Sequence, residues 1–108
     1  MSVGKIRAIV KRPDERYGHV TNISPTLQNL QKTVDGYIET FTLMDGVVII
    51  CDEEGRIKGK PFNCRIPADS IFSTSFVGDI AVLGVDGDDF TDCPLDFKVW
   101  KRLIGGAS

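Results

Sequence analysis

The fold is decided by a stretch in the middle of the chain, residues 27–51, which reads LQNLQKTVDGYIETFTLMDGVVIIC. Its first eight residues carry leucine and valine at helical spacing, with polar residues between them. Gly36 follows, and glycine can adopt the left-handed conformation that ends a helix. Residues 37–43 then alternate in the manner of a half-buried strand. The stretch predicts an amphipathic helix joined directly to a strand at residues 35–39, which we call the joint.

The strand at the joint continues into a hairpin. Residues 44–46, Met-Asp-Gly, predict a turn, and residues 47–51 form a run that is apolar on both faces. Such a run is typical of a central strand covered on both sides. In the first arm Ile38 is expected to face the helix, so that Tyr37 and Glu39 point away from it. Tyr37 and Glu39 are therefore minor candidates for a binding site.

Two further strands are expected before the helix. Residues 5–12 predict a strand with Ile6, Ala8 and Val10 on one face and Arg7, Ile9 and Lys11 on the other. Residues 17–23 predict a shorter, more polar strand near an edge of the sheet. Ser24-Pro25 predicts the start of the helix, because serine can cap a free backbone amide and proline needs no hydrogen-bond partner at the first helical position.

The second half of the chain adds three elements. Residues 57–66 predict an irregular extended segment, residues 76–85 a buried strand, and residues 93–104 a second helix. One stripe of that helix is expected to pack on the sheet or on a neighbouring subunit, and it consists of Leu95, Val99 and Leu103.

These elements together predict one α+β domain over residues 1–108. We expect a mainly antiparallel sheet of about five strands, an amphipathic helix after the second strand and a C-terminal helix. The length of 108 residues suits one hydrophobic core and is too short for two.

Composition narrows the possible functions. A net charge of −2 argues against a domain that binds nucleic acid by neutralising phosphates. No apolar run is long enough to span a bilayer, and the basic N-terminal region has no signal-peptide core, so we expect a cytoplasmic protein with no membrane partner. Cys51, Cys64 and Cys93 lie far apart and are expected to be reduced, buried thiols.

We find no catalytic or metal-binding motif and expect neither an enzyme nor a cofactor. His19 is the only histidine, which leaves no Ser/His/Asp arrangement and makes a metal site of His19 with all three cysteines a coincidence. Residues 55–61 have two glycines and two lysines but the wrong spacing for a phosphate loop, and proline replaces the metal-binding hydroxyl. Residues 52–54 are acidic but have no partner for acid/base catalysis.

An acidic turn, residues 86–92, is dense in carboxylates and has no positive charge. It could bind calcium, but its spacing departs from the calcium loop, and a strand-ending turn with solvated carboxylates is an alternative. A third use is interaction with a basic groove that normally holds nucleic acid. The carboxylates of this interpretation are Asp86, Asp88, Asp89 and Asp92.

Several blocks of the sequence resemble a small domain family of unknown function that is carried by bacteriophages, plasmids and Firmicutes. The blocks are residues 27–39, 48–55, 61–63, 78–84 and 89–90. The chain departs from the usual pattern at Asp35, where glycine is commoner, and at Asp52, where asparagine is commoner. The resemblance implies no catalytic residues. It implies an accessory or anti-defence protein, since some similar sequences are associated with inhibition of CRISPR effectors.

Three functions are therefore open. The first is a non-enzymatic inhibitor of a host defence protein, such as a Cas nuclease, that acts in the host cytoplasm. It would use either the acidic turn or the segment containing Glu53, Glu54, Lys58, Lys60 and Asn63.

The second is a module that sequesters a nucleotide signal through Lys58, Lys60 and Arg65. The third is a domain that forms a homo-oligomer through the C-terminal helix, on the face of Leu95, Val99 and Leu103.

Overall fold

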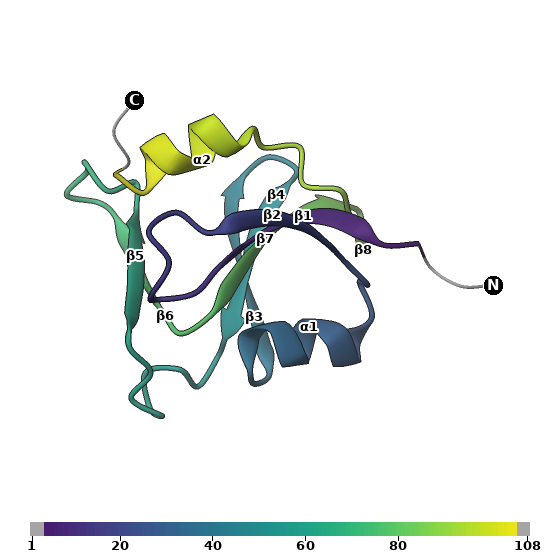
Figure 1. Ribbon diagram of the computed structural model, residues 1–108, viewed down its shortest axis with the longest axis horizontal. Coiled ribbons are helices and arrows are strands. Elements are labelled where there is room, and N and C mark those ends of the chain that lie inside the picture. Colours follow the sequence, from purple (N-terminus) through teal and green to yellow (C-terminus); the bar gives the residue numbers. More distant parts are fainter. Residues whose placement is uncertain (1–3, 106–108) are drawn as a thin grey trace.

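Ten elements follow one another along residues 4–105, the part of the chain that the computed structural model describes (Figure 1). In order they are β1 (Ile6–Lys11), β2 (His19–Ile23), α1 (Leu27–Val34), β3 (Ile38–Met44), β4 (Val47–Asp52), β5 (Phe62–Ile66), β6 (Thr74–Val77), β7 (Ile80–Asp86), β8 (Asp89–Thr91) and α2 (Phe97–Leu103).

The main sheet has six strands, all antiparallel to their neighbours. Its order is β2-β1-β7-β4-β3, and β8 pairs with the far end of β7. β7 is the strand that joins the two hairpins, because it pairs with β1 on one side and β4 on the other. β5 and β6 form a separate two-stranded sheet.

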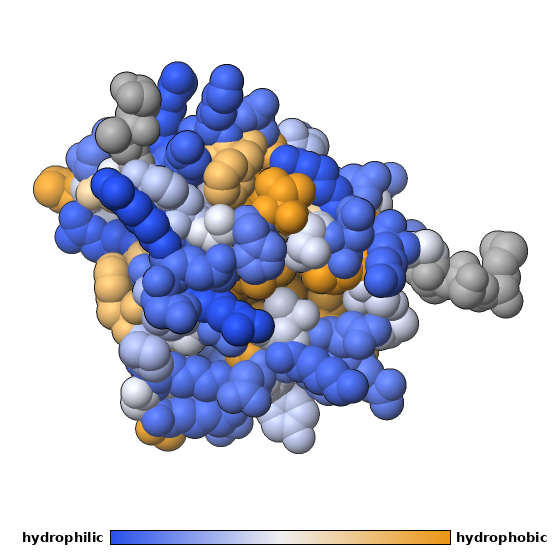
Figure 2. Space-filling view, viewed as in Figure 1, coloured by the Kyte–Doolittle hydropathy of each residue, from blue (hydrophilic) through white to orange (hydrophobic). Residues whose placement is uncertain are grey.

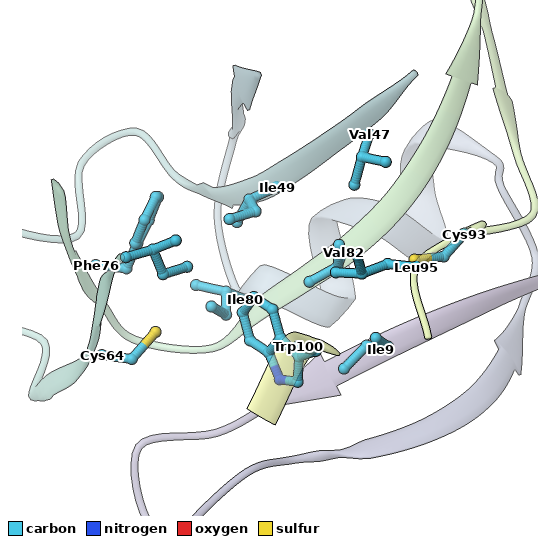
Figure 3. Close-up of a cluster of buried hydrophobic side chains, with 11 residues drawn as sticks. Ile9, Val47, Ile49, Cys64, Phe76, Ile80, Val82, Cys93, Leu95 and Trp100 are labelled. Carbon is cyan, nitrogen blue, oxygen red and sulfur yellow. The ribbon is translucent and has the colours of Figure 1, made fainter. Parts of the chain in front are cut away.

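The main sheet is covered on both faces (Figure 1). On one face α1 buries Leu30 and Val34 against the side chains that alternate along β1, β4 and β7. The opposite face is covered by α2 and by the β5–β6 hairpin. Trp100 of α2 is fully buried there, beside Ile9 and Ile80 (Figure 3). Its indole nitrogen donates to the carbonyl oxygen of Tyr17 at 2.8 Å, which satisfies the one polar atom of this buried ring.

A buried lysine holds the β5–β6 hairpin on the sheet. The Lys11 side chain is 3% exposed, and its Nζ donates to Oδ1 of Asn63 at 2.9 Å. The Asn63 amide donates in return to the carbonyl oxygens of Lys11, at 2.9 Å, and of Gly78, at 2.7 Å. Burial removes the ammonium group from water and lowers the pKa of Lys11. We call this reciprocal pair the clasp.

The structure confirms the α+β class, the hairpin of β3 and β4, and both helices. The hairpin pairs as expected, and β4 is a central strand buried on both faces. Ile38 is partly buried against α1, and Glu39 is exposed away from it, as predicted. Tyr37 is also exposed, but it lines a cavity together with Gln28, Gln31 and Lys32 of α1, so the expectation that it points away from the helix was wrong.

Other expectations were wrong in detail. The main sheet has six strands instead of about five, because it includes the three-residue β8, which has no long apolar run that would have predicted it. The expected strand 76–85 is two strands in different sheets, separated at Gly78, where φ is 71°. The helix N-cap is Thr26 instead of Ser24, since the Thr26 hydroxyl accepts from the amide of Asn29.

The C-terminal helix also differs from the expected one. It begins after Asp96, whose side chain caps it, so Leu95 is buried before the helix starts. Trp100 forms the centre of the packed face together with Leu103, while Val99 is 40% exposed. Leu95 and Leu103 therefore contact the core of their own chain, and the proposed oligomer face retains only Val99.

The surface seen in Figure 2 is mainly hydrophilic, and the apolar residues that reach it do so in separate spots. One spot at the left margin lies over the loop that joins β5 to β6. Among residues 4–105, no helix has the length and apolar character needed to cross a membrane.

Candidate functional site

The joint ends α1 at Asp35, one residue before the glycine that was expected to end it. Asp35 takes the left-handed conformation, with φ 55° and ψ 53°. The amide of Asp35 then donates to the carbonyl oxygen of Lys32 at 3.3 Å, and that of Gly36 to Gln31 at 3.1 Å. These bonds satisfy two carbonyls of the last turn. The expectation that Gly36 adopts the left-handed turn was therefore wrong: Asp35 does so.

Gly36 is required for a different reason: the position has no room for a side chain. A Cβ atom at this position would overlap the carboxylate of Asp52. The missing side chain lets the end of β4 approach the joint closely, as glycine does wherever backbone must pass near another group.

Asp52 is the centre of the site. It is the last residue of β4, and its side chain is fully buried. Its Oδ2 lies 2.8 Å from Nζ of both Lys58 and Lys60, and its Oδ1 accepts from the amide of Glu54 at 3.0 Å. We call Asp52, Lys58 and Lys60 the charge cluster. A buried carboxylate with two ammonium partners and a backbone donor is fully satisfied.

Lys60 connects the charge cluster to the end of α1. Its Nζ donates to the carbonyl oxygens of Val34, at 3.0 Å, and of Asp35, at 2.7 Å. A cation at a helix C-terminus is favoured by the helix dipole and satisfies carbonyls that have no partner within the helix. The loop between β4 and β5 is thereby fixed to the joint.

The charges set the pKa of Asp52. Burial alone would raise it, but the hydrogen bonds from Lys58, Lys60 and the amide of Glu54 outweigh burial and hold the pKa of this carboxyl well below its ordinary value. In the same way the hydrogen bond to Asp52 raises the pKa of Lys58. Both groups are therefore charged at neutral pH.

An open cavity of about 490 Å³ lies beside the joint. In its wall Tyr37 is 63% exposed, and Ile57, which precedes the lining residue Lys58 in the chain, is 86% exposed. The wall combines amide, cationic, acidic and aromatic groups, from Gln28, Gln31, Lys32, Asp35, Gly36, Tyr37, Glu54 and Lys58. We call these lining residues, with Ile57, the joint surface.

The chemistry available on this surface is that of binding. Amide and ammonium groups can form directional hydrogen bonds, and an exposed tyrosine ring offers a flat apolar face. The thiols lie elsewhere, and burial raises the pKa of each, that of Cys64 to about 11. Among residues 4–105, no group of three or more His, Cys, Asp or Glu side chains is placed to hold a metal ion.

The acidic turn lies at the far end of the sheet. Asp86, Asp88 and Asp89 are exposed where β7 turns into β8. The turn before β4 lies beside them, because the carbonyl oxygen of Gly46 accepts from the amide of Val85 at 3.0 Å. Asp92 is separate in role, since its Oδ1 accepts from the amide of Arg7 at 2.7 Å.

Of the three basic residues of the nucleotide hypothesis, the structure brings only Lys58 and Lys60 together. Lys58 and Lys60 share Asp52, and the Lys60 side chain is only 14% exposed. Arg65 lies on the β5–β6 hairpin, where its guanidinium donates to the carbonyl oxygen of Ala68. Asn63, also a predicted site residue, is buried in the clasp.

Two predicted carboxylates border another surface. Glu39 and Glu53 are exposed and line a smaller cavity, of about 260 Å³, between the β3–β4 hairpin and β6.

Sequence reasoning missed the α1 side of the joint surface, namely Gln28, Gln31 and Lys32. In the sequence these residues cannot be told apart from the polar, solvent-exposed face of any amphipathic helix. Asp52 had a stronger signal, because it directly continues the apolar run of β4 and is followed by two lysines. A carboxylate that continues a buried strand is expected to be buried itself, and a buried carboxylate requires a partner of opposite charge.

The first prediction concerns acid stability. We expect Asp52→Asn to lower the free energy of unfolding at neutral pH by about 2 kcal/mol, because it removes a buried charge that two ammonium groups face. The folded pKa of Asp52 lies below the unfolded value of about 3.9. This contribution is therefore present above pH 4 and is lost as pH falls further.

Denaturant unfolding from pH 7 down to pH 3 measures this effect. The gap between the natural chain and Asp52→Asn should narrow below pH 4, while Asp88→Asn, at the exposed acidic turn, serves as the matched control. A gap that stays constant over this range would contradict the assigned charge state.

The second prediction tests why position 36 must be glycine: because a side chain would overlap Asp52, or because the backbone conformation requires glycine. Gly36→Ala should lower the free energy of unfolding by about 2 kcal/mol, since the new methyl group overlaps the Asp52 carboxylate. On an Asp52→Ala background the overlap is gone, and the same substitution should cost less than about 0.5 kcal/mol. Equal costs on both backgrounds, measured by denaturant unfolding, would show that Gly36 serves the backbone instead.

Comparison with known proteins identifies a family. No curated protein and no solved structure matches the chain. A family model described as a domain of unknown function, DUF3846, matches residues 6–103, which include every strand and helix described above. The chain therefore belongs to the DUF3846 family of domains of unknown function.

Proposed function

We propose that this chain is a non-enzymatic accessory protein of a phage or plasmid, which binds and inhibits a host defence protein through the joint surface. The observation that carries the proposal is the exposed Tyr37 ring at the border of a cavity of about 490 Å³. Tyrosine is among the residues that most often dominate binding energy at protein interfaces.

The joint surface has the composition of such an interface. Tyr37 and Ile57 supply apolar area, and Lys32, Glu54 and Lys58 supply charges of both signs around it. An interface typically has an apolar centre and a polar rim.

The surface is also held in place before any partner arrives. The charge cluster fixes the loop that carries Glu54 and Lys58, and Lys60 of that cluster also fixes the end of α1. Fewer side chains and loops then lose freedom on binding, which increases affinity for a given contact area.

The class of partner is suggested by the resemblance to mobile-element sequences and by charge. Asp86, Asp88 and Asp89 form a second, exposed acidic surface that suits a protein with a nucleic-acid groove. A Cas nuclease has such a groove and is the partner that we propose. Binding there would compete with DNA.

The third prediction tests inhibition. Adding the protein to a Cas9-type nuclease should slow DNA cleavage, and the two proteins should elute together in gel filtration. Tyr37→Ala should weaken binding by at least about 30-fold, the effect of a central interface residue. Ile71→Ala is the matched control, because Ile71 is 92% exposed on the distant β5–β6 loop.

Cleavage at an unchanged rate, together with separate elution, would exclude a Cas9-type nuclease as the partner. Equal weakening by Tyr37→Ala and Ile71→Ala would exclude the joint surface as the contact.

A second function, sequestration of a nucleotide signal, is favoured by one feature of the same cavity. Tyr37 offers a ring for stacking, Lys32 and Lys58 offer positive charge for phosphate, and Gln28 and Gln31 offer amides for a base edge. This set replaces the predicted trio of Lys58, Lys60 and Arg65.

The fourth prediction tests this alternative by thermal unfolding with a panel of cyclic nucleotides. A true ligand at a hundred times its dissociation constant should add about 2.7 kcal/mol to the free energy of unfolding. Lys32→Ala should reduce this gain, whereas Arg65→Ala should not, because Arg65 lies on a different hairpin. A panel without any shift would exclude nucleotide sequestration by this surface.

A further inference from the structure

β3 lies at one edge of the main sheet and pairs only with β4. Its seven residues make it, with β7, the longest strand described. Exposed edges of this length are usually protected by lysine, proline or a covering segment, since unpaired backbone groups can pair with another chain. β3 carries neither lysine nor proline, and its one charged residue is Glu39.

The register shows which backbone groups face outward. The amide of Glu53 donates to the carbonyl oxygen of Tyr37 at 2.9 Å. Every second residue of β3, counted from Tyr37, therefore directs its backbone amide and carbonyl groups toward β4. The alternate residues, Ile38, Thr40 and Thr42, then point their amide and carbonyl groups away from β4. Backbone hydrogen bonds within residues 4–105 do not occupy these groups.

A groove borders the β3–β4 hairpin on the face away from α1. It is the cavity of about 260 Å³ between the hairpin and β6. Its apolar part includes the rings of Phe41 and Phe76, which meet edge to face with centroids 5.4 Å apart. Glu39 and Glu53 add two carboxylates to its wall, and among residues 4–105 neither has an ion-pair partner.

The second edge at the groove is less available. Arg56 reaches across and donates to the carbonyl oxygen of Ser75 in β6 at 2.7 Å. A strand that paired with β6 would have to displace this guanidinium. A strand that paired with β3 would displace no backbone hydrogen bond among residues 4–105.

We infer that β3 accepts an extended, basic segment of a partner protein as an additional antiparallel or parallel strand. Backbone hydrogen bonds to Thr40 and Thr42 supply affinity, as in other cases of strand addition. Alternate side chains of the segment enter the groove, an apolar one against Phe41 and a cationic one against Glu39.

Charge selects this occupant over a second copy of the chain. A second β3 would bring another glutamate and no cation to the edge. A basic segment neutralises Glu39 and Glu53 directly. The inference stands apart from the proposed function, because the joint surface can bind its own partner while the β3 edge stays empty.

The fifth prediction uses the blocked peptide KTVTKTV as the probe. Lysine and valine at its odd positions can face Glu39 and Phe41 while the threonines face the other side. Titration followed by backbone amide NMR should shift the signals of Thr40 and Thr42 first. Thr40→Pro removes an outward amide without touching the bonds to β4, and should weaken peptide binding at least about tenfold.

Two further variants test charge. Glu39→Lys should weaken peptide binding about fivefold at low salt, and Asp88→Lys, an equal charge change at the acidic turn, should leave it within about twofold. Thermal unfolding of each variant checks that it remains folded.

Backbone methylation of the peptide tests strand pairing without changing the protein. Peptides methylated at odd or at even amide nitrogens should differ, because only one set of amides faces β3.

Four results would overturn the inference. They are no peptide binding at millimolar concentration, equal binding by both methylated peptides, shifts confined to the acidic turn, and a peptide-free dimer that Thr40→Pro dissociates. The last would make a second copy the occupant.

Discussion

The ion pairs of Asp52 are the interaction on which the shape of the joint surface depends. This carboxylate sits at the end of β4, yet its partners come from the loop before β5, and one of them also caps α1. Three segments that are separate in sequence therefore meet at one buried charge. A buried carboxylate that lost its partners would be costly, so the three segments are held in one arrangement.

This arrangement explains why the joint is polar in a region of apolar packing. Hydrophobic burial fixes α1 on the sheet through Leu30 and Val34, but it does not specify where the helix must stop. The stop is specified by hydrogen bonds and by space: Asp35 turns the backbone, Lys60 takes up the carbonyls, and Gly36 leaves room for Asp52. Apolar contacts position the helix, and charged contacts position the surface beside it.

Periodicity in the sequence was sufficient for the elements that bury an apolar stripe. The hairpin of β3 and β4 and the packing of Ile38 against α1 could be predicted for that reason, whereas the position of Tyr37 beside α1 could not. The short strands β6 and β8 could not, because they have only four and three residues and no apolar run of their own. The charge cluster could be predicted only in part. The sequence shows Asp52, Lys58 and Lys60 near one another, but not that both lysines bond to one buried carboxylate or that α1 supplies part of the cavity wall.

The strand order has a consequence for how the chain folds as it is made. The β1–β2 and β3–β4 hairpins are complete once residue 52 is present, but they do not touch each other in the sheet. β7 lies between the two hairpins in the sheet and is synthesised some thirty residues after β4. The two hairpins can therefore join into one sheet only when β7 pairs with both β1 and β4. A ribosome must therefore release most of this domain before its core can form, and contacts of such long range favour slow, late and cooperative folding.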